Sequence, residues 1–287
     1  MLTVGLFPNL KKAQVDAVLH KIVSYLTERG VQAIIPCETA EIMQFSNMVC
    51  STVPLDKIDV ALSLGGDGTF MNIARNIAAK KIPVCGVNLG KLGFLTEVEL
   101  SEIEDALDSL IAGKYNIEER LMLETTVERL DDSIPSTLAL NDMVITKNGY
   151  SRMIRLNLFV NNVYTATYPA DGLIIATPTG ATAYSLSAGG PFVAPSAKVM
   201  VVTSICSHTL HSRSLVVSEE DIITITIDDT SADVVLSADG QAAVNLTPKD
   251  KIMIRKAPDS ARFIRFYGKS YFDILRNKLY RGDFYNQ

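Results

Sequence analysis

Residues 59–69, Asp59-Val-Ala-Leu-Ser-Leu-Gly-Gly-Asp-Gly-Thr69, join an apolar run to a glycine-rich turn. The apolar run has the length and composition of a buried strand, and a helical pattern follows over residues 69–80. A strand that leads through a tight turn into a helix is the first half of a crossover unit, which connects parallel strands. This stretch therefore predicts an α/β domain with a parallel sheet.

The same alternation continues on both sides of this stretch. Strands are predicted at residues 4–7, 31–35 and 82–88, and helices at residues 11–29 and 101–112. The second of these helices begins with a Ser-x-x-Glu capping box at Ser101 and Glu104. Residues 1–115 are therefore expected to form a Rossmann-like α/β domain.

The pattern changes at about Ile117, where many short strands with few helices begin. Such a run favours a sandwich or a related all-β fold, so residues 116–267 are expected to form a β-rich domain. The C-terminal tail, residues 268–287, holds one more helical segment at 271–278. It could dock anywhere, and we take a return to the first domain as a hypothesis.

Composition sets limits on the class of protein. The 287 residues are about two typical domains, and 47% hydrophobic against 21% charged residues excludes a disordered or fibrous chain. A formal net charge of −5 gives no global basic field, which argues against nucleic acid as a partner. Four scattered cysteines and the lack of a visible signal sequence suit a reduced, cytoplasmic protein. The long uncharged stretch 172–197 is broken by glycine and proline, so no membrane span is expected.

The glycine-rich turn carries the clearest chemical signal. Gly65, Gly66 and Gly68 let a ligand approach the backbone, and the N-terminus of the following helix suits a phosphate. Asp67 would repel that phosphate, so its charge needs a use, either as general base towards a hydroxyl or as a Mg²⁺ ligand. The alternative is a structural turn with Asp67 as helix N-cap. Neither a Walker A sequence nor a G-x-G-x-x-G sequence is present.

Three further segments could form a binding site. Small side chains in residues 171–190 leave room for a flat neutral ring, and Thr182, Tyr184, Ser185 and Ser187 offer uncharged hydrogen-bonding groups. The alternative is a Ser/Thr/Gly-rich loop. Asn141-Asp142 could reach one ligand only near a strand end or a bulge, and a turn is the simpler interpretation. Residues 237–241 are typical of an Asx turn.

Together these segments resemble the NAD kinase family, which phosphorylates the 2′-hydroxyl of the adenosine ribose of NAD. The matching pieces are residues 65–69, 86–95, 141–142, 171–190 and 239–241, in family order. The first piece is shared with diacylglycerol kinases, sphingosine kinases and phosphofructokinase. The block Thr177-Pro-Thr-Gly-Ala-Thr-Ala-Tyr-Ser-Leu-Ser187 is far more specific to NAD kinases.

The resemblance implies a role for each matching residue. Asp67 would be the proton acceptor, and Gly65, Gly66 and Thr69 would bind phosphate. Gly68, Asn141, Asp142, Arg152, Asp171 and Gln241 would contact the dinucleotide, and the loop residues Thr182, Ala183, Tyr184 and Ser187 would line the adenine pocket. It also implies a two-domain fold, ATP as donor, a divalent metal such as Mg²⁺, and a homodimer or homotetramer whose subunits share the nicotinamide site.

One residue departs from the pattern. Pro169 stands two residues before Asp171, where many bacterial members have a basic residue, so one charge contact and the preference between NAD and NADH stay open. The phosphate-contacting cations also stay open among Arg75, Lys91, Arg152, Arg155 and Arg213. The alternatives are a lipid kinase of the diacylglycerol type and a non-catalytic dinucleotide-binding regulator. Since the motifs fall in both domains, we expect the active site between them.

Overall fold

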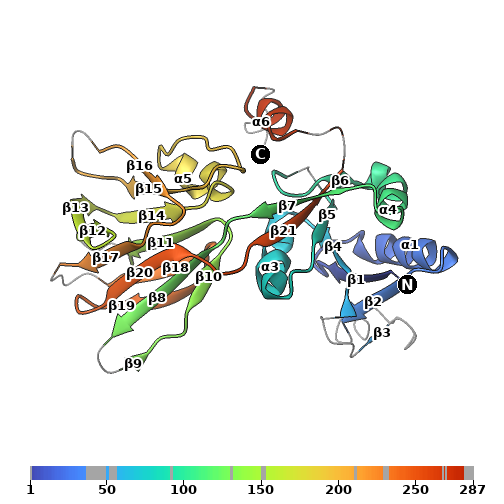
Figure 1. Ribbon diagram of the computed structural model, residues 1–287, viewed down its shortest axis with the longest axis horizontal. Coiled ribbons are helices and arrows are strands. Elements are labelled where there is room, and N and C mark those ends of the chain that lie inside the picture. Colours follow the sequence, from blue (N-terminus) through green and yellow to red (C-terminus); the bar gives the residue numbers. More distant parts are fainter. Residues whose placement is uncertain are drawn as a thin grey trace. The chain divides into compact units, whose positions relative to one another are not determined.

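The computed structural model describes residues 2–36, 50–51, 57–90, 93–129, 132–149, 153–209, 212–228, 233–266, 268 and 270–280. The chain forms two compact units, Met1–Glu119 with Ala261–Gln287, and Arg120–Ser260 (Figure 1). No helix among the described residues is both long and apolar enough to cross a membrane.

The described residues of the first unit form an eight-stranded sheet in the order β3-β2-β1-β4-β5-β21-β7, with β6 paired to β5. Its strands β1, β2, β4, β5, β6 and β21 are joined by parallel pairs. The bounds are β1 Thr3–Pro8, β2 Gln32–Pro36, β3 Cys50–Ser51, β4 Val60–Gly65, β5 Val84–Asn88, β6 Val98–Glu99, β7 Asn116–Arg120 and β21 Ala261–Arg265. The predicted α/β domain with a parallel sheet is confirmed.

Helices cover both faces of this sheet (Figure 1). The helices are α1 Val15–Glu28, α3 Asp67–Ile77, α4 Ile103–Ile111 and α6 Tyr271–Tyr280, with short 3₁₀ turns at Ala78–Lys80 and Leu100–Glu102. On one face, Leu19 of α1 and Leu107 of α4 pack with Leu6 and Leu62 of the sheet. On the other face, Phe70 of α3 meets the ring of Phe263 edge to face, with the ring centroids 4.6 Å apart.

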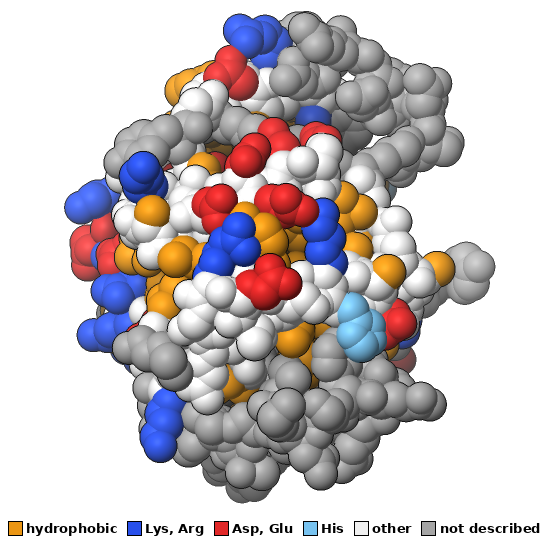
Figure 2. All heavy atoms as spheres, turned by 90° about the vertical axis from the view of Figure 1, so that its right-hand side faces the viewer, with side chains coloured by type: hydrophobic (Ala, Val, Ile, Leu, Met, Phe, Trp, Pro, Cys, Tyr) orange, Lys and Arg blue, Asp and Glu red, His pale blue; other side chains and the backbone are white. Residues whose placement is uncertain are grey.

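The outer surfaces of α1 and α4 are held together by charge. Lys21 Nζ lies 2.6 Å from Glu104 Oε1, and Arg29 Nε lies 3.2 Å from Asp108 Oδ1. Figure 2, which shows the face on the right of Figure 1, accordingly has Lys and Arg side chains among Asp and Glu side chains rather than in a separate basic patch. These exposed pairs each contribute at most about 1 kcal/mol.

The second unit is an antiparallel β-sandwich, as predicted. A seven-stranded sheet has the order β10-β8-β20-β17-β12-β13, with β9 paired to β8, and a six-stranded sheet has the order β16-β15-β14-β11-β18-β19. Alternate apolar side chains of both sheets, such as Leu156, Ile225, Met143 and Ile175, form one buried core. The bounds are β8 Leu123–Arg129, β9 Asp132–Ser133, β10 Thr137–Ala139, β11 Asp142–Lys147, β12 Ile154–Val160, β13 Val163–Ala170, β14 Gly172–Ala176, β15 Val199–Ile205, β16 Leu215–Ser218, β17 Ile223–Ile227, β18 Val234–Ala238, β19 Gln241–Leu246 and β20 Lys251–Lys256.

Two strands lie in a different unit from the one that the pattern change suggested. Both β7 and β21 fall within residues 116–267, yet they belong to the sheet of the first unit. The reason is visible in β21, whose Phe263 and Ile264 are buried in that unit. Helix α6 of the tail contacts the first unit through Lys278, whose Nζ lies 5.1 Å from the centre of the Phe94 ring.

Helix boundaries also differ from the expected ones. Helix α1 begins at Val15 because residues 9–14 form a hydrogen-bonded turn, in which Lys12 donates to Asn9 O and Val15 donates to Lys12 O. The capping box predicted at Ser101 and Glu104 is wrong. It is formed by Glu99 and Glu102, because the helical segment already starts at Leu100.

Candidate active site

The glycine-rich turn forms the N-terminal end of α3. Strand β4 ends at Gly65, Gly66 is the extended residue that precedes the helix, and the helix begins at Asp67. A Cβ on Gly65 would lie 2.5 Å from Thr69 Oγ1, so this position admits only glycine. Cβ atoms on Gly66 and Gly68 would meet no atom within 4 Å, so the backbone there is open to a ligand. The free N–H groups of the first helical turn give this place a preference for anions.

The carboxylate of Asp67 is held by the loop that follows β5. Its Oδ1 accepts hydrogen bonds from the N–H groups of Leu95 and Thr96 at 3.2 and 3.1 Å and from Thr96 Oγ1 at 3.2 Å. Among the residues that the structure describes, its Oδ2 accepts one bond, of 2.7 Å from the N–H of Phe94. The interpretation of Asp67 as an N-cap is therefore wrong, since Gly66 occupies that position and the carboxylate binds a different segment.

Gly93 makes this arrangement possible. A Cβ on Gly93 would lie 1.8 Å from Asp67 Oδ1, a distance at which the two atoms would overlap. Gly93 was not among the predicted site residues, although it lies within the segment 86–95 that carries the family resemblance. Position 93 requires glycine because of the Asp67 carboxylate, which is distant in sequence.

In the second unit, a bend at residues 140–142 is held by Asp239. The Asp239 carboxylate accepts the N–H groups of Leu140, Asn141 and Asp142 at distances of 2.7 to 3.2 Å. Asp239 has a φ of +51° and Gly240 a φ of +67°, and the flanking residues of β18 and β19 are paired across them. Positive φ at both central residues defines a type I′ hairpin turn, for which Asp-Gly is a favoured sequence. That signal could have identified the turn that was assigned to the Asx type.

Asp142 is buried with 4% of its surface exposed, at the start of β11. Burial, and then the negative charge of Asp239, raise the pKa of the Asp142 carboxyl to about 7. Asn141 precedes the strand in the same bend, so the two neighbours lie at a strand end, the arrangement in which both side chains can face one ligand.

The small-residue block after β14 packs directly on this bend. Thr177 donates its N–H to Asn141 O at 2.8 Å and its hydroxyl to Leu140 O at 2.6 Å. A Cβ on Gly180 would lie 2.0 Å from Asn141 O, so glycine is required there for close packing of the two segments. A 3₁₀ turn at Gly180–Thr182 and the one-turn helix α5 Tyr184–Ser187 follow.

The predicted site residues of this block differ in how far they are exposed. Thr182 and Ala183 are half-buried, and Tyr184 and Ser187 are exposed. Burial raises the pKa of Tyr184 above its usual value, and the charges of Cys206, Asp142 and Asp171 raise it further, so Tyr184 lies within electrostatic reach of both carboxylates. Asp171 is paired with Lys147, with 2.8 Å between Lys147 Nζ and Asp171 Oδ1. In the second unit, Asn141 and Asp142 thus lie at the start of β11 and Asp171 lies beside Lys147 at the other end of that strand, with Tyr184 within electrostatic reach of both carboxylates.

The remaining predicted residues are less informative. Gln241 pairs with Ala238 beside the Asp239–Gly240 turn. Arg152 and Lys91 lie outside the described residues. Arg75 donates to Asn72 on its own helix, Arg213 donates to the carbonyl of Ser212, and Arg155 lies 3.9 Å from Asp228. Arg155 is also the cross-strand neighbour of Pro169, the position that departs from the family pattern.

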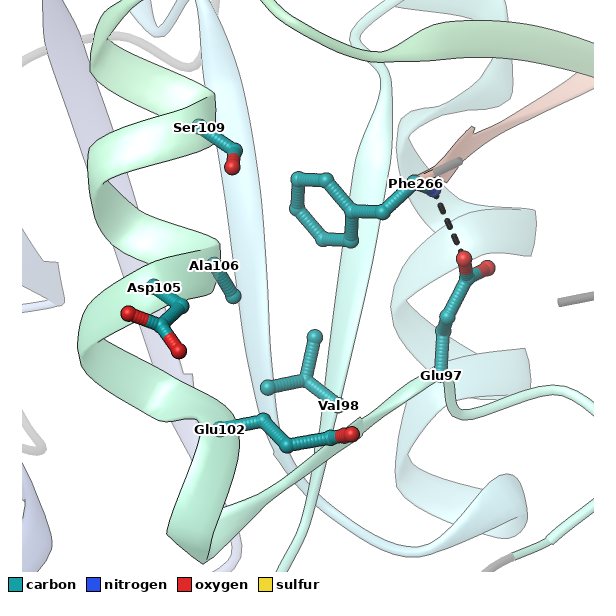
Figure 3. Close-up of a pocket in the computed structure, with 7 residues that line it drawn as sticks. All are labelled: Glu97, Val98, Glu102, Asp105, Ala106, Ser109 and Phe266. Atoms are coloured by element: carbon teal, nitrogen blue, oxygen red, sulfur yellow. Dashed lines mark hydrogen bonds between the residues drawn. The ribbon is translucent and has the colours of Figure 1, made fainter. Parts of the chain in front are cut away.

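A cavity of about 210 Å³ lies elsewhere in the first unit, between α4 and the residues around β6 and the end of β21 (Figure 3). It is lined by Glu97, Val98, Glu102, Asp105, Ala106, Ser109 and Phe266. The Glu97 carboxylate accepts the N–H of Phe266 at 2.7 Å and pairs with Arg265 at 2.9 Å, so its charge is neutralised within the fold. None of the predicted site residues lines this cavity.

Few side chains of the described residues are placed to ligate a metal ion. Within the described part of the chain, no three His, Cys, Asp or Glu side chains are grouped so that they could hold one. Mg²⁺ is commonly held by one or two carboxylates together with the phosphates of the substrate. The residues at the α3 N-terminus fit a metal ion of that kind, with Asp67 as the available carboxylate.

Comparison with known proteins decides the family. The model of the ATP-NAD kinase N-terminal domain matches residues 4–115, and the model of the ATP-NAD kinase C-terminal domain matches residues 140–266. The chain belongs to the ATP-NAD kinase family. Its chemistry is accordingly that of the ATP-dependent NAD kinases, phosphoryl transfer to NAD, and the alternatives of a lipid kinase and of a non-catalytic regulator are not favoured.

Individual NAD kinases are similar over nearly the whole chain. The NAD kinase of Moorella thermoacetica is 43% identical over 282 residues, which cover 98% of this chain and 90% of that protein. The NAD kinase of Thermoanaerobacter sp. is 44% identical over 280 residues, which cover 97% of this chain and 99% of that protein.

Solved structures of the family share the fold. Yeast NADH kinase, solved with NADH, has a TM-score of 0.86 at 24% identity and covers 100% of this chain and 89% of its own. An NAD kinase from Archaeoglobus fulgidus, solved with ATP, has a TM-score of 0.73 at 25% identity and covers 96% of this chain and 98% of its own.

Proposed function

We propose that this protein transfers the γ-phosphoryl group of ATP to the 2′-hydroxyl of the adenosine ribose of NAD, with Asp67 as general base. The observation that carries this proposal is the unequal use of the two Asp67 oxygens. From the described residues, Oδ1 accepts three hydrogen bonds, whereas Oδ2 accepts one and keeps capacity for a further donor. A carboxylate fixed in this way can receive a hydroxyl proton without having to reorganise.

The reaction requires little covalent help from the protein. The 2′-hydroxyl loses its proton to Asp67 Oδ2 as its oxygen bonds to the γ-phosphorus, and the bond between that phosphorus and the bridging oxygen breaks to release ADP. Positioning and charge stabilisation supply most of the catalysis in phosphoryl transfer. The open backbone at Gly66 and Gly68 and the N–H groups at the start of α3 would stabilise phosphate, with Gly65 and Thr69 shaping the turn.

We assign the metal to the phosphates of the donor. When bound to ATP, Mg²⁺ would neutralise charge on the transferred group, which is the chemistry that it supplies in kinases. Among the described residues at the α3 N-terminus, Asp67 is the carboxylate that could contact it.

Binding of NAD is assigned to the second unit. Asn141 and Asp142 would hold the adenosine part, the segment with Thr182, Ala183, Tyr184 and Ser187 would line the pocket of the adenine, and Asp171 would face the nicotinamide end. Support comes from the hydrogen bonds that join the 140–142 bend to Thr177 and from the exposed ring of Tyr184, 45% accessible. Gly68, Arg152 and Gln241 complete the proposed set.

A homodimer or homotetramer in the cytoplasm is part of the same proposal. Val163 and Tyr164, on the edge strand β13, are 67% and 58% exposed, which suits an interface between copies. The free thiols of Cys85 and Cys206 suit a reducing compartment. Light scattering during gel filtration would give the number of subunits, and a monomer would contradict the assignment.

The direct test is incubation of the purified protein with NAD, ATP and Mg²⁺, followed by separation of the nucleotides. NADP should form, and it should not form when EDTA replaces Mg²⁺. Parallel reactions with NADH as acceptor and with polyphosphate as donor define the substrate range. Phosphorylation of diacylglycerol without NADP formation would contradict the proposed function.

A further inference from the structure

A lysine outside the predicted site lies at the same edge of the first sheet as the glycine-rich turn. Strand β1 lies between β2 and β4, and the chain continues from β1 to β2 but from β4 to β5, so the carboxyl ends of β1 and β4 form a topological switch point. Ligands of open parallel sheets bind at such a switch point. The segment that leaves β1 there, residues 9–14, contains Lys11 and Lys12.

This segment is fastened to the ends of both neighbouring strands. Asn9 donates its N–H to Leu64 O at 2.8 Å and its side-chain amide to Thr69 Oγ1 at 3.0 Å. Gln14 donates to Leu89 O at 2.6 Å. These bonds join residues 9–14 to the end of β4, to the first turn of α3 and to the end of β5. The segment is therefore a fixed part of the switch point.

The ammonium group of Lys12 lies over the turn that follows β5. A Cβ built on Gly90 would lie 3.8 Å from Lys12 Nζ and 3.9 Å from Asn88 Oδ1, so the ammonium and the amide flank the same small residue. In the described part of the chain, no carboxylate comes within ion-pair distance of Lys12, whereas Lys21 on the following helix is paired with Glu104. Lys12 thus supplies a positive charge that the fold does not use.

The side-chain amide of Asn88 is a second polar group near this turn, and its Nδ2 donates no hydrogen bond to the described residues. It is 4% exposed at the end of β5, directly paired with Gly65 of β4. Its Oδ1 accepts the N–H of Gly90 at 3.0 Å, but its Nδ2 is buried and has no hydrogen-bond partner among the described residues. A buried donor without an acceptor costs about 1–3 kcal/mol. Such a group needs a functional explanation, and an anion at the switch point would provide the acceptor.

We propose that Lys12 and Asn88 bind the phosphate chain of the donor nucleotide, Lys12 by an ion pair and Asn88 through Nδ2. This inference rests on the proposed function, because it requires a polyphosphate donor at the α3 N-terminus. It assigns the cation that the sequence left open to a lysine of the β1–α1 turn rather than to Arg75, Arg155 or Arg213.

The test measures binding separately from turnover. Dissociation constants of a non-hydrolysable ATP analogue, of adenosine and of NAD are determined by calorimetry for the wild type, Lys12→Ala, Lys12→Arg and Lys11→Ala. Lys12→Ala should weaken binding of the ATP analogue by about 10-fold or more, as expected for a charge-assisted contact. The dissociation constants of adenosine and NAD should not change. Lys12→Arg should restore most of the affinity, and Lys11→Ala should bind like the wild type.

Asn88→Asp examines the second contact. It keeps an acceptor for the Gly90 N–H but replaces the amide donor, so the ATP analogue should again bind at least about 10-fold more weakly while NAD binding persists. The thermal unfolding midpoint should fall, because the new carboxylate is buried. If it unfolds, the Lys12 variants still decide the proposal, because Lys12 is exposed.

The proposal would be overturned if Lys12→Ala bound the ATP analogue with wild-type affinity. It would also be overturned if Lys11→Ala lost as much affinity for the analogue as Lys12→Ala, or if Lys12→Ala lost as much affinity for adenosine as for the analogue. Failure of the proposed function is a separate result, since it would show as a wild-type protein that makes no NADP. A wild type that makes NADP, combined with an unaffected Lys12→Ala variant, would remove only this inference.

Discussion

The Asp239 carboxylate accepts the Asn141 N–H at 2.7 Å, across a separation of 98 residues in the chain. The same carboxylate holds the N–H groups of Leu140 and Asp142, so one side chain of a hairpin turn fixes the bend that carries the proposed NAD-binding pair. If Asn141 and Asp142 bind NAD as proposed, Asp239 is a positioning residue that acts on the substrate through them.

Asp239→Ala should weaken NAD binding. The change leaves three backbone donors without their acceptor, which costs about 1–3 kcal/mol, and frees the bend to move. We expect a KM for NAD raised about 10-fold or more, with a lower thermal unfolding midpoint. Asp233→Ala is the matched control, because this exposed aspartate precedes the same strand, β18. A normal KM in Asp239→Ala would show that the bend keeps its shape without the carboxylate.

Gly93→Ala should impair turnover more than NAD binding. The new Cβ would lie 1.8 Å from Asp67 Oδ1, so the carboxylate must leave its place among Phe94, Leu95 and Thr96. A misplaced base lowers kcat, and we expect a fall of about 100-fold. Steady-state kinetics and calorimetry with NAD separate the two effects. A variant with normal kcat would mean that the orientation of Asp67 is unimportant.

Asp142 should make the stability of the free protein depend on pH. Its folded-state pKa, raised to about 7 by burial and by Asp239, lies above the ordinary value of 3.8. The contribution of the protonated form is therefore fully present below that ordinary value and is lost as pH rises through about 7.

Asp142→Asn removes this titration. Because one pKa unit corresponds to about 1.4 kcal/mol, the free energy of unfolding of the variant should fall by at least about 1 kcal/mol less than that of the wild type between about pH 5 and pH 8. Urea unfolding at several pH values measures the difference. Parallel curves for the two proteins would contradict the raised pKa.

The sequence was sufficient to predict the class of both units. Alternating apolar strands and helices before residue 115, and short strands after it, are local patterns, and local patterns determine which elements form. The partner of a strand is not a local property. The local sequence pattern of β21 resembles that of the β-strands before it in the chain. It nevertheless joins the first sheet, because Phe263 packs on Phe70, a residue far away in the chain.

The candidate site shows the same division. Asp67, Asn141, Asp142 and Tyr184 could be proposed because they lie within segments that resemble a family. The structure places Asn141 and Asp142 in one bend, with Tyr184 within electrostatic reach of Asp142. Asp239, Gly93 and Lys12 were missed because each matters through a contact with a distant segment. For Asp239, the following glycine was a usable hairpin signal. For Lys12, an exposed lysine in a turn carries no signal until the turn is fastened to Leu64 and Leu89.

The role of Asp67 as general base is tested most directly by Asp67→Asn, compared with Asp105→Asn, an exposed aspartate on α4, under saturating NAD, ATP and Mg²⁺. The amide keeps an acceptor oxygen for the 94–96 loop but cannot take a proton. Loss of a general base predicts a fall in NADP formation of about 100-fold or more, with the dissociation constant of NAD unchanged and Asp105→Asn equal to the wild type. Near-normal NADP formation by Asp67→Asn would contradict the assignment and leave Asp67 as a structural anchor of the loop.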